Sequence, residues 1–81
     1  MAEDRRYNIL SLLKTEFPGF EIRLDQLYWK DPLFRQIARE YHECIRQEAI
    51  TQEQGRKSEF YRETINELSE ELLVYLNNYN P

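Results

Sequence analysis

The chain's only histidine and only cysteine, His42 and Cys44, lie two residues apart in the stretch AREYHEC (38–44). Imidazole and thiolate are common metal ligands, and together they can also form a base and a nucleophile. In a helix, however, residues two apart point about 200° away from each other. His42 also has no Asp, Glu, His or Cys four positions away, the spacing that metal-binding helices use. We therefore predict that Cys44 is a buried, unreactive thiol and that His42 is a surface side chain.

Other signatures of catalysis are missing from the sequence. It has no glycine-rich phosphate loop, no Cys–Cys metal pair, no Ser–His–Asp set and no calcium loop. We therefore predict no catalytic, metal or cofactor-binding residues, and a protein that is not an enzyme. The weaker alternative is a small enzyme subunit that completes a site together with a partner.

A stripe of positive charge is the second candidate for function. Arg35, Arg39, His42 and Arg46 follow one another at spacings of four, three and four, which places them along one side of a helix. The stripe could bind an acidic partner or a phosphate-bearing ligand. It could also be an ordinary solvated flank, softened by Glu43, and both interpretations stay open.

A later segment has the opposite charge. Glu59, Glu63, Glu67 and Glu70 line the side of the expected last helix that faces away from its apolar residues. This face could bind a basic partner, or it could simply keep the protein soluble.

Composition narrows the class of protein. The 81 residues include 41% hydrophobic residues but only two glycines and three prolines, which favours one small helical domain over a turn-rich β fold. The net charge of −4 argues against non-specific nucleic-acid binding. One cysteine cannot form an internal disulfide, and we find neither a signal-peptide pattern nor a membrane-spanning apolar run. These features predict a soluble, cytoplasmic protein without membrane contact.

Apolar residues recur at helical spacing through most of the chain. The first helix is expected over about 3–15 with Asp4 as its N-cap, and the turn FPGF (17–20) ends it. A short element follows, in which apolar residues from Phe20 onward have helical spacing. The alternation of polar and apolar residues in EIRL also leaves a strand open. Asp31 and Pro32 then begin a helix that should end near residue 53, because Asp suits the N-cap and Pro the first helical position.

The last helix is expected over about 59–78, after a connection at 54–58 with Gly55 as C-terminal cap and Ser58 as N-cap. Its apolar seam has the spacing of a coiled coil and consists of Tyr61, Ile65, Leu68, Leu72, Tyr75 and Tyr79. We predict an all-α fold in one domain, 1–81. Residues 31–79 form an antiparallel helical hairpin in it, and residues 1–30 add one or two shorter helices to complete a small bundle.

The stretch DPLFRQIAREYHE (31–43) resembles the start of the small bacterial YdcH-type family. The matching residues are Pro32, Phe34, Ile37, Glu40, Tyr41 and His42, whereas Cys44 stands where that family has leucine. The likeness covers residues 31–76. The chain departs from the family in having about thirty residues before Asp31 and glutamates where the family's second helix is rich in lysine. The resemblance implies a helical hairpin, often self-associating, of uncharacterised function, and it supplies no catalytic residue.

The leading functional hypothesis is a non-catalytic protein–protein interaction module. The alternative is a binder of an anionic ligand or of a nucleic-acid backbone through the arginine stripe. We further predict a two-fold homodimer, because Phe60, Leu73 and Val74 lie off the apolar seam and would stay exposed in a simple hairpin. The alternative is that the N-terminal segment covers these residues.

Overall fold

The computed structural model describes residues 5–55 and 59–79, and within these ranges every element is a helix. The helices are α1 (Arg5–Glu16), α2 (Glu21–Lys30), α3 (Pro32–Glu53) and α4 (Glu59–Asn78). The all-α prediction is therefore confirmed for the described residues, and the segment after Phe20 is helix rather than strand. The caps expected at Asp4 and Ser58 lie outside the described residues. None of these four helices is both long enough and apolar enough to cross a membrane.

Asp31 joins α2 to α3 and caps both helices. Asp31 is the C-cap of α2, and its backbone N–H donates to the carbonyl of Leu27 at 2.9 Å. Its carboxylate Oδ1 accepts from the backbone N–H groups of Leu33, at 3.0 Å, and Phe34, at 3.2 Å, which would otherwise have no partner in the first turn of α3. Asp31 itself is extended (φ −113°, ψ 108°) and precedes Pro32, so the chain changes direction here.

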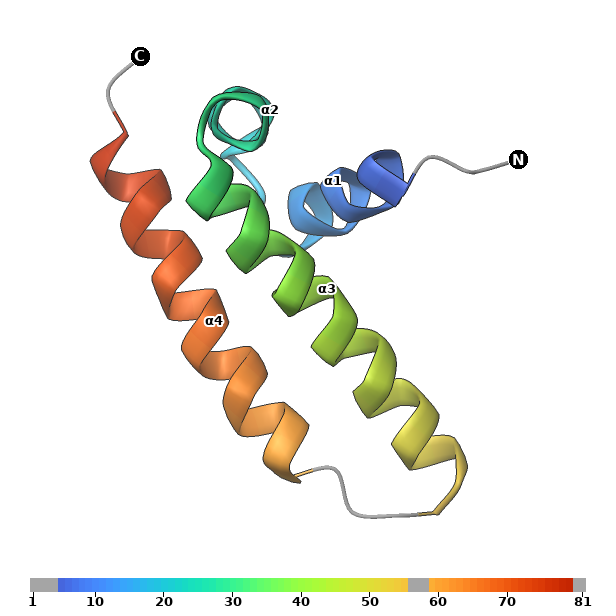
Figure 1. Cartoon of the computed structure of the whole chain (residues 1–81). Coiled ribbons are helices and arrows are strands. Elements are labelled where there is room, and N and C mark those ends of the chain that lie inside the picture. The colour runs from blue at the N-terminus through green and yellow to red at the C-terminus, as the bar shows by residue number, and fades with distance from the viewer. Residues whose placement is uncertain (1–4, 56–58, 80–81) are drawn as a thin grey trace.

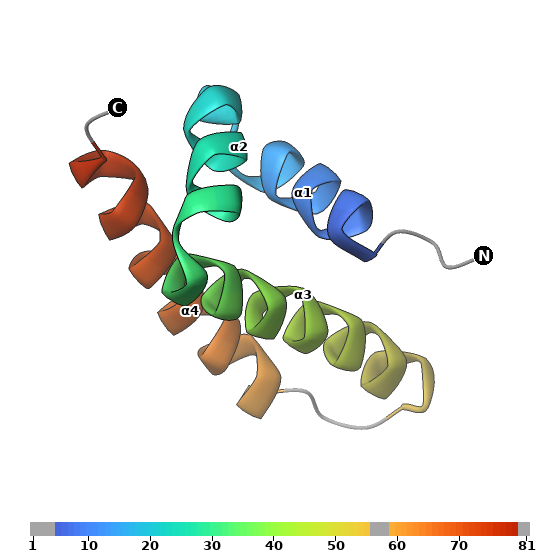
Figure 2. The ribbon, with the colours of Figure 1, turned by 45° about the horizontal axis from the view of Figure 1, so that its top comes forward.

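α3 is the helix on which the others pack. It contacts α1, α2 and α4, and α4 lies beside it and runs in the opposite direction (Figure 1). α2 lies near the start of α3, at the end of the molecule where α4 finishes (Figure 2). α1 packs against α2 and α3. The turn from α1 into α2 uses Gly19 at φ 92°, a backbone conformation that side-chain-bearing residues rarely adopt.

The core lies where all four helices come together. Two ring contacts connect its parts, Phe17 with Tyr41 at 5.9 Å and Phe34 with Tyr75 at 5.6 Å between centroids. Between Tyr41 and Leu68, no residue that the structure describes is fully buried. The buried apolar residues are Ile9, Leu13, Phe17, Leu24, Leu27, Tyr28, Phe34, Ala38, Tyr41, Leu68, Leu72 and Leu76.

Replacement of Asp31 by alanine should destabilise the fold, because it leaves the first N–H groups of α3 without an acceptor. The expected loss is about 0.5–2 kcal/mol of unfolding free energy, measured by urea denaturation. The Asp31→Asn variant should keep most of that stability, because asparagine caps helices about as well as aspartate. Equal losses in the two variants would contradict a capping role.

Tyr41 makes the stability of the fold depend on pH in the alkaline range. Burial raises the pKa of its hydroxyl from 10.0 to about 12, and the nearby Glu16 carboxylate contributes in the same direction. Because the folded pKa is the higher one, the folded state keeps this contribution to stability below pH 10 and loses it as pH rises towards about 12.

We therefore expect the unfolding free energy to fall as pH rises through this window, and to fall less in the Tyr41→Phe variant. Urea denaturation at several alkaline pH values measures this difference. Tyr79→Phe is the control, since Tyr79 is only half-buried. An identical alkaline slope in the wild type and in Tyr41→Phe would show that Tyr41 is not responsible.

Candidate functional site

Arg35, the first member of the predicted arginine stripe, is part of the fold. It is half-buried in the first turns of α3, and its Nη1 donates to the carbonyl of Tyr28 at 2.8 Å. That carbonyl is among the last four of α2, which have no partner within their own helix. Arg35 therefore fixes the end of α2 against α3, and this bond competes with binding of an external anion.

The other members of the stripe lie further along the same continuous helix. Arg39 and Arg46 are exposed and His42 is half-buried, so His42 is less accessible than the surface position that its sequence predicts. Two exposed arginines seven residues apart form a weaker anion site than the four-residue stripe suggests. The fully exposed part of the predicted stripe therefore consists of Arg39 and Arg46.

Cys44 is half-buried rather than fully buried, which corrects the prediction. It packs against the edge of the core, beyond Tyr41, the last fully buried residue of α3. Burial raises the pKa of the Cys44 thiol, and the carboxylates of Glu40 and Glu43 raise it further, because all three disfavour the thiolate. Within the described parts of the chain, no three His, Cys, Asp or Glu side chains are grouped so that they could hold a metal ion.

The three residues predicted for self-association differ in exposure. Phe60 is 72% exposed and Val74 is 58% exposed. Leu73, by contrast, is half-buried and packs against the core, so the expectation that it stays exposed is wrong. Leu73 follows the fully buried Leu72 and lies one turn before the fully buried Leu76, on the flank of α4 that packs against the core.

Phe60 and Val74 belong to one face of α4, which we call the outer face. They are 14 residues apart, which corresponds to about 21 Å along the helix, and they point in nearly the same direction. The side chains between them on this face are exposed carboxylates. The outer face thus consists of Phe60, Glu63, Glu67, Glu70, Glu71 and Val74.

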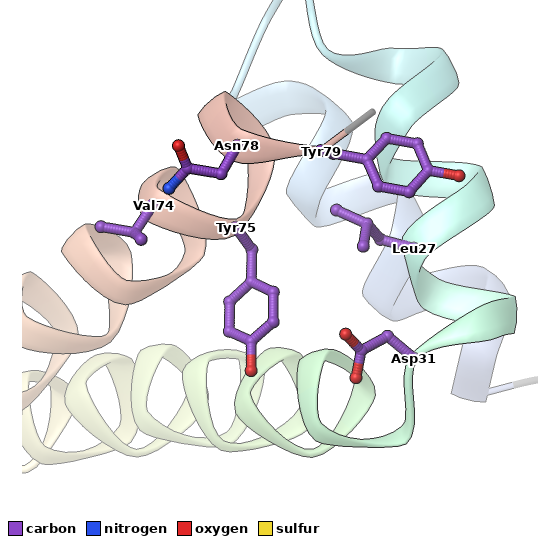
Figure 3. Close-up of a pocket in the computed structure, with 6 residues that line it drawn as sticks. All are labelled: Leu27, Asp31, Val74, Tyr75, Asn78 and Tyr79. Carbon is purple, nitrogen blue, oxygen red and sulfur yellow. The ribbon is translucent and has the colours of Figure 1, made fainter. Parts of the chain in front are cut away.

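An open cavity of about 370 Å³ lies next to Val74, between the ends of α2 and α4. In Figure 3 the ring of Tyr75, from α4, and that of Tyr79, which directly follows α4, lie on either side of Leu27, and the Asp31 carboxylate is directed towards Tyr75. The edge contact with Phe34 holds the Tyr75 ring in place. The lining residues are Leu27, Asp31, Val74, Tyr75, Asn78 and Tyr79.

The sequence does not reveal this cavity. The four-residue spacing of Tyr75 and Tyr79 places both rings on one side of a helix, and that signal is visible before folding. The sequence pattern assigns these tyrosines to an apolar seam, however, and Asp31 to a helix cap. The position of Leu27 beside these residues depends on the change of direction between α2 and α3 at Asp31.

Comparison of the chain with protein-family models, with curated proteins and with solved structures finds no match. The YdcH-type resemblance of residues 31–76 therefore remains a sequence-based expectation.

Proposed function

We propose that this chain is a non-catalytic protein–protein interaction module, and that the outer face of α4 is its contact surface. The observation that carries the proposal is the exposure of Phe60 and Val74 at the two ends of this face. Exposed apolar area lowers the free energy when a partner covers it, by roughly 25 cal/mol per Å². In this proposal α3 and α4 act as a helical hairpin that presents the face.

The charge of the outer face selects the partner. Glu63, Glu67, Glu70 and Glu71 lie between the two apolar ends and are all exposed. Arg62 is the nearest arginine on α4, and it pairs with Glu48 of α3 at 3.4 Å. A partner with two apolar groups and basic side chains between them therefore complements this face best.

A second copy of the chain is the other candidate, and the geometry of the face supports it. Glu67 lies seven residues from both Phe60 and Val74, so a two-fold axis at Glu67 brings Phe60 of one copy against Val74 of the next. The same axis brings two Glu67 carboxylates together, which opposes association. The proposed dimer, with its coiled-coil-like contact between two α4 helices, is therefore weaker than a complex with a basic partner.

The interaction face can be tested with a designed amphipathic peptide that has two leucines spaced like Phe60 and Val74 and lysines between them. We expect it to bind the protein in fluorescence anisotropy, and its affinity to fall with salt, since exposed charges are screened over about 8 Å at physiological ionic strength. Phe60→Ser should weaken binding roughly tenfold, as loss of a central apolar contact does.

The matched control is Ile22→Ser, because Ile22 is 74% exposed but lies on α2, away from the outer face. A version of the peptide with glutamates in place of its lysines should not bind. Equal losses in the two variants, or equal binding of the two peptides, would contradict the proposal.

Light scattering across a concentration series tests the homodimer. We expect the mass to rise from 10.0 kDa towards twice that value, and to do so at lower concentration in high salt, because salt screens the repulsion between the two Glu67 side chains. Glu67→Gln should strengthen the dimer in low salt. A monomer mass at high micromolar concentration under all these conditions would rule the dimer out.

A further inference from the structure

We propose that the cavity between α2 and α4 binds an alkylammonium group, the chemistry of a lysine side chain. The inference deepens the proposed function and rests on it, because the partner protein on the outer face supplies the lysine. Val74 connects the two sites, since it lies on the outer face and also lines the cavity. A basic partner that lies along α4 would therefore reach the cavity at its far end.

The walls of the cavity suit the methylene stem of such a group. Leu27 and Val74 provide apolar surface, and the rings of Tyr75 and Tyr79 lie on either side of Leu27 (Figure 3). Aromatic faces also attract an ammonium group when it lies within about 6 Å of the ring centre. Tyr75 is prepared for this role, because its edge contact with Phe34 restricts the ring before a ligand arrives.

The charge of the cavity is negative. Asp31 is the only ionised side chain among the six lining residues, and none of the six is lysine or arginine. Its carboxylate is fixed by the two backbone N–H groups that Oδ1 caps, so little freedom is lost when a cation binds.

Two helix ends lie beside the cavity, and each is bonded by an arginine. Both α2 and α4 end beside it, and the C-terminal end of a helix carries partial negative charge. Arg23 and Arg35 are the nearby arginines with hydrogen bonds to these ends, and they donate to the carbonyls of Leu76 and Tyr28 without lining the cavity. These guanidinium groups offset the partial charge of the helix ends, so the preference for a cation over an anion rests on the two aromatic rings and the fixed carboxylate.

The test is a pair of NMR titrations of the full chain, one with Nα-acetyl-lysine amide and one with its uncharged analogue, Nα-acetyl-norleucine amide. We expect the amide signals of residues around 27–31 and 74–79 to shift, and the lysine probe to bind roughly tenfold more tightly. Equal affinity for the two probes, or shifts confined to other parts of the chain, would overturn the proposal.

Two carboxylate variants distinguish binding of lysine in the cavity from attraction of lysine by the overall negative charge of the protein. Asp31→Asn keeps the helix cap but removes the charge, and it should reduce the preference for lysine to about twofold. Asp25→Asn is the matched control, because Asp25 also lies on α2 but pairs with Lys14 at 3.0 Å, outside the cavity. An unchanged preference in Asp31→Asn, or the same drop in both variants, would overturn the assignment.

The source of the ammonium group is tested with the basic peptide, extended by one lysine beyond the leucine that meets Val74. Replacement of that lysine by norleucine should weaken binding to the wild type and leave binding to Asp31→Asn unchanged. If the two peptides bind equally while the lysine amide still binds, the cavity takes a free amine and the partner assignment is wrong. If the cavity fails these tests while Phe60→Ser still weakens binding, the interaction face stands without it.

Discussion

The arrangement of this protein depends on the double cap at Asp31. One residue ends α2 with its backbone N–H and begins α3 with its carboxylate, so no helical residue separates the two helices. The extended backbone at Asp31, followed by Pro32, prevents α2 and α3 from forming one long helix. As a result α2 turns across the end of α4, where Arg23 donates to the carbonyl of Leu76 at 3.0 Å. The cavity is a direct consequence of this turn.

The arginines fall into two groups, one that bonds to helix ends and one that is exposed to solvent. Arg23 and Arg35 satisfy carbonyl groups at helix ends, whereas Arg39 and Arg46 are exposed on α3. This division leaves the acidic outer face of α4 without an equivalent basic surface nearby on the same helix. This charge distribution is the reason for proposing a basic partner rather than a second copy of the chain.

Local signals in the sequence predict the helices well. The bounds 32–53 and 59–78 agree with the structure, because Asp31–Pro32 and Gly55 mark helix ends through their own backbone preferences. The partial burial of Leu73 and the cavity are different, since both depend on how separate helices pack together. The bond from Arg35 to the carbonyl of Tyr28, seven residues earlier, depends in turn on the change of direction at Asp31. A helical pattern reports which face of one helix is apolar, but it does not report which neighbour covers each flank.

The fully buried core ends at Tyr41 on α3 and at Leu68 on α4, and no described residue between these two in the chain is fully buried. Segments with few buried contacts open at a small fraction of the free energy of global unfolding. Phe60 lies in this less stable half and Val74 lies beside the core. A partner would therefore meet a preorganised surface at Val74, whereas at Phe60 part of its binding free energy would be spent on ordering the helices. The two ends of one contact surface thus differ in conformational entropy, although their exposed side chains look equivalent.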